Sequence, residues 1–91
     1  PNYHISKKKI ELTPELNVPQ VLEEMKERYK KQPINTIDGV RIDFDKEWVH
    51  LRASNTEPII RIYVESDSIS KAEYLANKIL VDIKEIISEK L

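Results

Sequence analysis

The stretch DGVRIDFDKEWVHLRASNTEPIIRIYVES, residues 38–66, alternates apolar and polar side chains over most of its length. Because successive side chains of a strand point to opposite faces of a sheet, a period of two predicts half-buried strands. The Asp38–Gly39 pair, which holds the single glycine of the chain, predicts a turn in front of them. We expect three strands, over residues 40–45, 48–52 and 59–65, with the first two joined in a hairpin through residues 45–47.

The flanking segments predict two helices and two further strands. Residues 70–91 carry apolar side chains at helical spacing, and a shorter helix is expected after Asn17, its candidate cap. For the longer helix we expect a capping box of Ser70 with Glu73 and a staple of Ile69 with Tyr74. Two more extended segments complete the prediction, residues 3–12 at the start and residues 34–37 ahead of the glycine turn.

The predicted order is therefore β-α-β-β-β-β-α, within a single domain spanning residues 1–91. Strands that share one apolar face with two amphipathic helices predict an α+β two-layer sandwich, an antiparallel sheet with both helices on one face. Of the exposed-face residues, we expect Trp48 to cover an edge of the core. The opposite face of the sheet is predicted to carry Arg41, Trp48, His50, Arg52, Arg61 and Tyr63.

Composition excludes several classes of protein. The 91 residues carry a formal net charge of −1, no cysteine and two histidines, so we expect no disulfide framework, no typical zinc site and no global attraction for nucleic acid. Apolar runs are too short for a spanning helix or a signal peptide, which predicts a soluble cytoplasmic protein. Because the chain starts at Pro1, we expect it to be a fragment of a longer polypeptide.

The segment RASNTEP, residues 52–58, combines features that suit an anion. Unpaired amides of a tight turn form an anion nest, and Ser54 and Thr56 add hydroxyl donors. Asn55 tolerates a positive φ that lets neighbouring amides converge. Arg52 offers a planar fork that matches phosphate oxygens, and Arg61 would add a second cation if its strand returns beside that of Arg52.

Other interpretations of the same residues remain open. The segment is also typical of a structural turn, in which Arg52 pairs with Glu57 or Asp43. A free-standing nucleic-acid or phosphoprotein-binding module that uses the polar sheet face is a further alternative. We expect no binding or catalytic role for the lysines of residues 7–9, a solvated run, or for His50, which has no partner carboxylate in the sequence pattern.

Residues 38–66 resemble the C-terminal domain of the phosphohexomutases, the phosphoglucomutase and phosphomannomutase family. The resemblance rests on the aspartate-glycine turn, the tryptophan-led strand that ends in arginine, the segment Arg-x-Ser-(Gly or Asn)-Thr-Glu-Pro and the following strand with a further arginine. Residues 3–10 and the terminal helix also resemble the family, and the first helix does so weakly. Where many members have glycine this chain has Asn55, which also tolerates left-handed backbone.

The resemblance implies a fold similar to one repeat of the TATA-box-binding protein. It also implies a fourth domain that closes over a cleft and binds the phosphate that is not transferred. The catalytic phosphoserine and the Mg²⁺ site would lie in other domains of the same polypeptide, so this chain would bind no cofactor and be inactive alone. Its partners would be those domains, hexose 1-phosphate or 6-phosphate and the bisphosphate intermediate, with no nucleic acid and no membrane; the sugar is selected largely elsewhere. The implied phosphate-binding residues are Arg52, Ser54, Asn55, Thr56 and Arg61, with Glu57 as a possible orienting residue.

Overall fold

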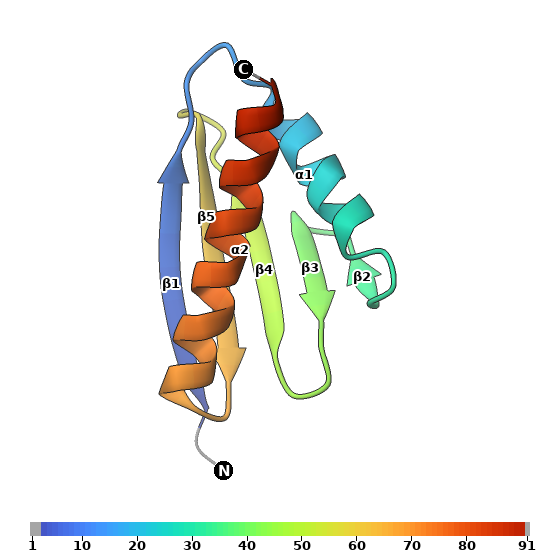
Figure 1. The fold of residues 1–91 in the computed structure, drawn as a ribbon, viewed down its shortest axis with the longest axis vertical. Helices are drawn as coiled ribbons and strands as arrows, with labels where there is room; N and C mark the ends of the chain where they lie inside the picture. The colour runs from blue at the N-terminus through green and yellow to red at the C-terminus, as the bar shows by residue number, and fades with distance from the viewer. Residues whose placement is uncertain (1–2, 91) are drawn as a thin grey trace.

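The computed structural model describes residues 3–90 and confirms the predicted order of elements (Figure 1). Strand pairs are all antiparallel, and the sheet order is β1-β5-β4-β3-β2. The elements are β1 (His4–Glu11), α1 (Val18–Arg28), β2 (Ile34–Asn35), β3 (Val40–Asp43), β4 (Trp48–Ala53), β5 (Ile59–Ser66) and α2 (Ile69–Lys90).

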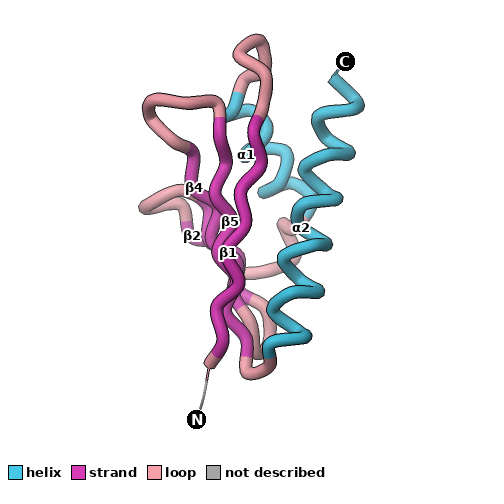
Figure 2. The backbone as a smooth tube through the Cα atoms, turned by 90° about the vertical axis from the view of Figure 1, so that its left-hand side faces the viewer, coloured by secondary structure: helices cyan, strands magenta, loops and turns pink. Residues whose placement is uncertain are grey.

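Both helices cover the same face of the sheet, as predicted, so the protein is an α+β two-layer sandwich (Figure 2). The longer helix α2 lies along β1 and β5, and α1 lies beside α2 over the other half of the sheet (Figure 1). Because no element covers the other face among residues 3–90, that face is open along β1, β5, β4 and β3 (Figure 2).

The core fills the space between the sheet and the helices. Alternate residues of β3, β4 and β5 enter it, and they meet the apolar stripes of the two helices. The predicted alternation is confirmed for β3, for β4 and for β5 from Ile60 onward, but Ile59, expected on the opposite face, is only 4% exposed. Strand β1 contributes Ser6 as well as Ile10 to the buried side. The apolar side chains with no exposed surface are Val21, Met25, Ile42, Val49, Leu51, Ile60, Ile62, Val64, Ala76, Ile79 and Ile83.

Helix capping follows the prediction for α1 but not for α2. The Asn17 side chain accepts a hydrogen bond from the Gln20 amide at 3.1 Å, as expected. At α2 the cap is Ser68 rather than Ser70, because the Ser68 hydroxyl accepts from the Lys71 amide at 3.3 Å. The predicted staple is also wrong, since Ile69 and Tyr74 are 63% and 71% exposed.

The predicted capping-box glutamate, Glu73, serves a different purpose. Its carboxylate accepts a hydrogen bond from the Ser6 hydroxyl at 2.6 Å and pairs with the Lys8 ammonium at 2.9 Å, which ties α2 to β1. The Ser6 hydrogen bond, and then the Lys8 interaction, hold the pKa of Glu73 below its ordinary value. A long-range contact has therefore replaced the local one that the spacing suggests.

A charged cluster joins the two helices near the ends of α1 and α2. Asp82 is nearly buried and accepts hydrogen bonds from the Tyr29 hydroxyl and from Arg28 at 3.5 Å. Burial, and then the hydrogen bond to Asp82, raise the pKa of Tyr29 above its ordinary value. Arg28 reaches Glu85 as well, at 2.8 Å. No helix in the described part of the chain combines the length and apolar character that crossing a bilayer requires.

Candidate phosphate-binding loop

The candidate loop connects β4 to β5 over residues 54–58, at one end of the open face. The strands on either side are antiparallel, and their register pairs Arg52 directly with Arg61. This confirms the expectation that Arg61 returns beside Arg52. Both side chains are exposed on the open face, because the residue before Arg52 and the residues on either side of Arg61 are buried in the core.

The loop amides are held mainly by one hydroxyl group. Ser54 donates its own amide to the Ile59 carbonyl at 3.0 Å. The Ser54 hydroxyl then accepts from the amides of Thr56 and Glu57, each at 3.3 Å. The sheet leaves two loop amides unsatisfied, as expected, but they are not unpaired as an anion nest requires, because the Ser54 hydroxyl accepts from both. Their bonds are long, so a stronger acceptor could compete for them.

Asn55 does not take the left-handed conformation that we expected. Among residues 3–90, Gly39 alone has a positive φ, at 70°. The loop turns without a left-handed residue because the Ser54 hydroxyl bonds to backbone two and three positions ahead, a local motif that bends the chain by itself. The amides converge on the Ser54 oxygen through that motif and not through the conformation of Asn55.

Arg52 is held by a different acid from those considered above. Its guanidinium lies 3.5 Å from the Asp38 carboxylate, and the two side chains are 52% and 66% exposed. Asp43 instead pairs with Arg41 at 2.9 Å, and no ion pair joins Glu57 to an arginine within residues 3–90. An exposed pair at this distance is weak, so Arg52 is restrained but available to a ligand.

The Asp38–Gly39 turn supports this arrangement. The Asp38 carbonyl accepts a hydrogen bond from the His50 ring at 2.5 Å, while the Asp38 carboxylate pairs with Arg52. His50 points away from the core, as expected, and its contact with the turn is structural. The turn therefore links β4 to the segment before β3 at the same end of the sheet as the loop.

A hollow of about 260 Å³ lies beside the loop, lined by Arg52, Ala53, Ser54, Arg61 and Tyr63. The structure thus brings together three of the predicted site residues, Arg52, Ser54 and Arg61. Asn55, Thr56 and Glu57 lie on the loop outside this lining, although the Thr56 hydroxyl is 3.4 Å from that of Ser54. Tyr63 is an additional lining residue that the sequence analysis placed on the face but not in the site. Its position, two residues after Arg61 in one strand, is the signal that could have found it.

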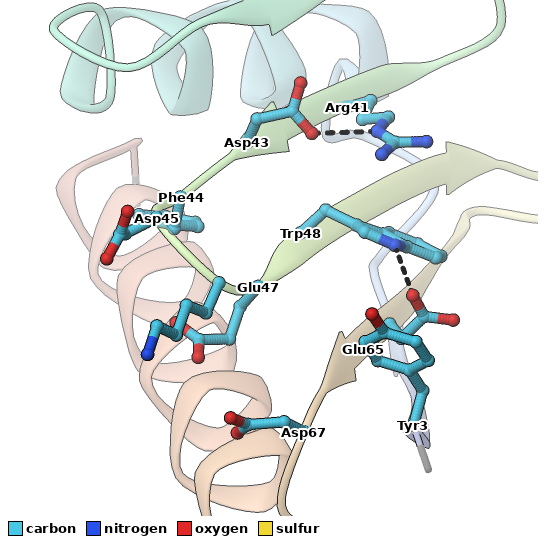
Figure 3. A pocket seen from close by; sticks show the side chains of 10 residues that line it. Tyr3, Arg41, Asp43, Phe44, Asp45, Glu47, Trp48, Glu65 and Asp67 are labelled. Atoms are coloured by element: carbon cyan, nitrogen blue, oxygen red, sulfur yellow. Dashed lines mark hydrogen bonds and ion pairs between the residues drawn. The ribbon is translucent and has the colours of Figure 1, made fainter. Parts of the chain in front are cut away.

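A larger hollow of about 750 Å³ lies at the opposite end of the open face, around the β3–β4 turn (Figure 3). Trp48 lies in it, where its indole N–H donates to Glu65 at 2.9 Å and Arg41 lies 4.8 Å from its ring centre. The expectation that Trp48 packs on the core is therefore wrong. The acids of this hollow outnumber its bases, which makes it unsuited to a phosphate dianion; they are Asp43, Asp45, Glu47, Glu65 and Asp67 against Arg41 and Lys46.

No group of three or more histidine, cysteine or acidic side chains arranged to hold a metal ion occurs in the described part of the chain. The geometry that remains is an exposed pair of arginines beside a hydroxyl-centred turn, at the cationic end of an open sheet. It defines a class of two-layer α+β domain with an exposed arginine-bearing loop at one end of its sheet.

Comparison with known proteins makes the assignment more specific. The sequence pattern of the phosphoglucomutase/phosphomannomutase C-terminal domain matches residues 9–81. The chain belongs to this family, which confirms the resemblance noted above.

The matched relatives are sugar-phosphate mutases. A phosphoglucosamine/phosphogalactosamine mutase of Sulfurisphaera tokodaii is 37% identical over 99% of the chain and 19% of its own length. A phosphoglucosamine mutase of Methanococcus maripaludis is 34% identical over 98% of the chain and 20% of its own length. A phosphoglucomutase/phosphomannomutase of Thermococcus kodakarensis is 57% identical over 50% of the chain and 10% of its own length. The chain therefore spans about a fifth of the length of the first two relatives.

Proposed function

We propose that the chain is the C-terminal domain of a cytoplasmic phosphosugar mutase and that its β4–β5 loop binds the phosphate that is not being transferred. Family membership supports the enzyme class, because the matched relatives are mutases. The observation that carries the role of the loop is the cross-strand pair Arg52–Arg61 beside Ser54, at the lining of one hollow.

The chemistry of the loop suits a phosphate monoester. A phosphate dianion offers three terminal oxygens, and it is a stronger acceptor than a hydroxyl. It would accept hydrogen bonds from the Arg52 guanidinium and from the amides of Thr56 and Glu57, which now donate to Ser54 at 3.3 Å. It would also form an ion pair with Arg61. Asn55 contributes here through its backbone and side-chain donors. Glu57 is the residue least suited to an anion, and an orienting role for it would need a contact with an arginine that forms when the ligand binds, because it pairs with no arginine within residues 3–90.

Binding of the phosphate that is not transferred would accelerate the reaction by positioning the rest of the substrate. Phosphoryl transfer depends mainly on alignment and charge stabilisation, so a fixed far phosphate holds the acceptor hydroxyl in line. A loop that recognises phosphate and not sugar accepts either end of a hexose bisphosphate. It would also allow the domain to close the cleft over 1-phosphate and 6-phosphate forms. The phosphoserine and Mg²⁺ belong to other domains of the polypeptide, so this domain alone is inactive.

Two features disfavour a nucleic-acid or phosphoprotein module. The open face has an acidic end around Trp48, where five acids outnumber Arg41 and Lys46, and the arginines Arg52 and Arg61 line the hollow at the other end. A backbone-tracking groove needs cations along its length.

The test is Arg52→Ala in the full-length mutase. We expect kcat/KM to fall by about 100-fold or more, because the reacting hydroxyl loses its alignment. The matched control is Arg41→Ala, which removes an exposed arginine from the other end of the same face. Equal activity of the Arg52 variant and the unmodified enzyme would refute the assignment. A far-ultraviolet spectrum identical to that of the parent would show that folding is intact.

A further inference from the structure

The row of side chains that includes Arg52 and Arg61 continues onto β1. The β1–β5 register places Lys9 opposite Arg61, and it places Lys7 opposite Tyr63 in the neighbouring row. Lys9, Arg61 and Arg52 therefore lie side by side across three strands, all exposed on the open face. The view along the sheet in Figure 2 shows that this face is turned away from both helices.

The three consecutive lysines of β1 are not equivalent. Lys8 faces the helix layer, where it pairs with Glu73 at 2.9 Å. Lys7 and Lys9 face the open side. Lys9 reaches Glu11 only at 4.0 Å, with both side chains more than half exposed, and Lys7 forms no ion pair with any residue in the range 3–90.

Arg61 is similarly unneutralised. Within the described residues it forms no ion pair, although it lies between two other cations in the same row. Like charges directly opposite each other destabilise a sheet. Lysines on β1 also protect an edge strand from unwanted pairing, but edge protection gives no reason for two opposed arginines on the inner strands β4 and β5. An anionic ligand would relieve the repulsion across the whole row.

The surface is hollowed on both sides of Arg61. One hollow is the site at the β4–β5 loop, and the other, of about 240 Å³, is lined by Lys7, Lys8, Lys9, Arg61 and Tyr63. The two share Arg61 and Tyr63, so they are neighbours. An anion in the second hollow would meet Lys7, Lys9 and Arg61, with the Tyr63 side chain as part of the wall.

We propose that Lys7, Lys9 and Arg61 form a second anion subsite that takes a phosphate dianion next to the loop site. Its role rests on the proposed function, because Arg61 serves both subsites and can pass an incoming phosphate from the lysines to Arg52. The dianion comes either from the sugar phosphate as it enters the cleft or from free inorganic phosphate. Lysine and arginine on an open face raise the local concentration of such an anion and speed its capture.

The direct test is a titration of the isotope-labelled 91-residue chain with inorganic phosphate, followed by the amide resonances. We expect two responses, one from residues 53–57 and one from residues 7–9 and 61–63. The double substitution Lys7→Gln/Lys9→Gln should raise the dissociation constant measured at residues 7–9 and 61–63 by about 10-fold, since two charged donors are lost. The control Lys31→Gln/Lys84→Gln removes the same charge from exposed lysines elsewhere and should leave both responses unchanged.

Two outcomes would overturn the subsite. One is amide shifts confined to residues 53–57, and the other is an equal loss of phosphate affinity in the control variant. Arg52→Ala separates this proposal from the function of the loop. Loss of the response at residues 53–57 with the β1 response retained supports both. A response at residues 53–57 that survives Arg52→Ala refutes phosphate binding by Arg52 in the loop, while the subsite on β1 stands.

Kinetics of the full-length mutase distinguish the source of the dianion. If the sugar phosphate uses the subsite, the double lysine variant lowers kcat/KM by about 3- to 10-fold at low salt, leaves kcat unchanged, and the loss shrinks as salt rises. If free phosphate uses it, kcat/KM without added phosphate is unchanged and inhibition by inorganic phosphate weakens. A loss of kcat alone, or no kinetic effect of either kind, contradicts the subsite.

Discussion

Substitution of Gly39 by alanine tests how much the glycine in the turn before β3 contributes to the stability of the fold. Gly39 has φ of 70°, a conformation that costs an L-residue about 1–2 kcal/mol. A Cβ built there would also overlap the main-chain carbonyl oxygen of Leu51, and overpacking of this kind costs about 1–3 kcal/mol. Together they predict a loss of about 2–5 kcal/mol, which for a chain of this size lowers Tm by about 10–30 °C. Urea unfolding followed by circular dichroism measures the loss directly.

The variant Gly39→Asn separates the two causes. Asparagine tolerates left-handed backbone better than alanine, but it brings the same Cβ toward Leu51. We therefore expect Gly39→Asn to keep at least half of the destabilisation of Gly39→Ala. Asp38→Ala, which removes only an exposed ion pair to Arg52, should change stability by less than about 1 kcal/mol. A Gly39→Ala variant within about 0.5 kcal/mol of the parent would refute the reasoning, because surface substitutions without strain fall in that range.

Three further predictions concern the core and the contacts between layers. Ile83→Ala should lower the unfolding free energy by about 2–5 kcal/mol in urea titrations with unchanged m, because Ile83 is fully buried. Asp82→Ala should cost about 1–3 kcal/mol by leaving the Tyr29 hydroxyl without its acceptor. Less than additive loss in the double variant with Tyr29→Phe would confirm the coupling, and strict additivity would contradict it. Glu73→Gln should destabilise the chain at pH 7, with the difference closing as pH falls below about 4.3. The sign follows because the folded pKa of Glu73 is depressed, chiefly by Ser6: the stabilisation is present above the unfolded pKa and is lost as pH falls through the folded one. A difference that persists at pH 2 would show that shape and not charge is responsible.

Much of the fold could be predicted from periodicity and turn chemistry. The alternation in β3, β4 and β5 fixed which residues enter the core, and Gly39 marked a turn that has a positive φ. Local capping signals were less reliable. Asn17 caps α1, but the Ser70–Glu73 pattern failed because Glu73 forms stronger contacts with Ser6 and Lys8 on β1. The local hydrogen bond of a capping box is weaker than charged contacts with residues that are far away in the sequence but close in the fold.

The candidate site shows the same division. The motif around Arg52 and the presence of Arg61 on the return strand could be found in the sequence, and the register confirms that they are opposed. The conformation of Asn55 was predicted wrongly, because a residue type that tolerates positive φ need not adopt it when a serine hydroxyl already closes the turn. Trp48 lies on the predicted face of the sheet, but its expected packing on an edge of the core is wrong, because its indole N–H donates to Glu65 and Arg41 lies against its ring.

Local sequence patterns specify the order of elements, the faces of the inner strands and the residue types of the segment 52–58, because these depend on neighbours within a few positions. The tertiary structure decided which charges are neutralised. Among the residues that the structure describes, Lys8 has an acidic partner and Lys7 has none, since Lys8 faces α2 and Lys7 faces the open side of the sheet. Periodicity assigns a residue to a face, but the partner on that face is brought there by strand register and helix packing, which join positions far apart in the chain.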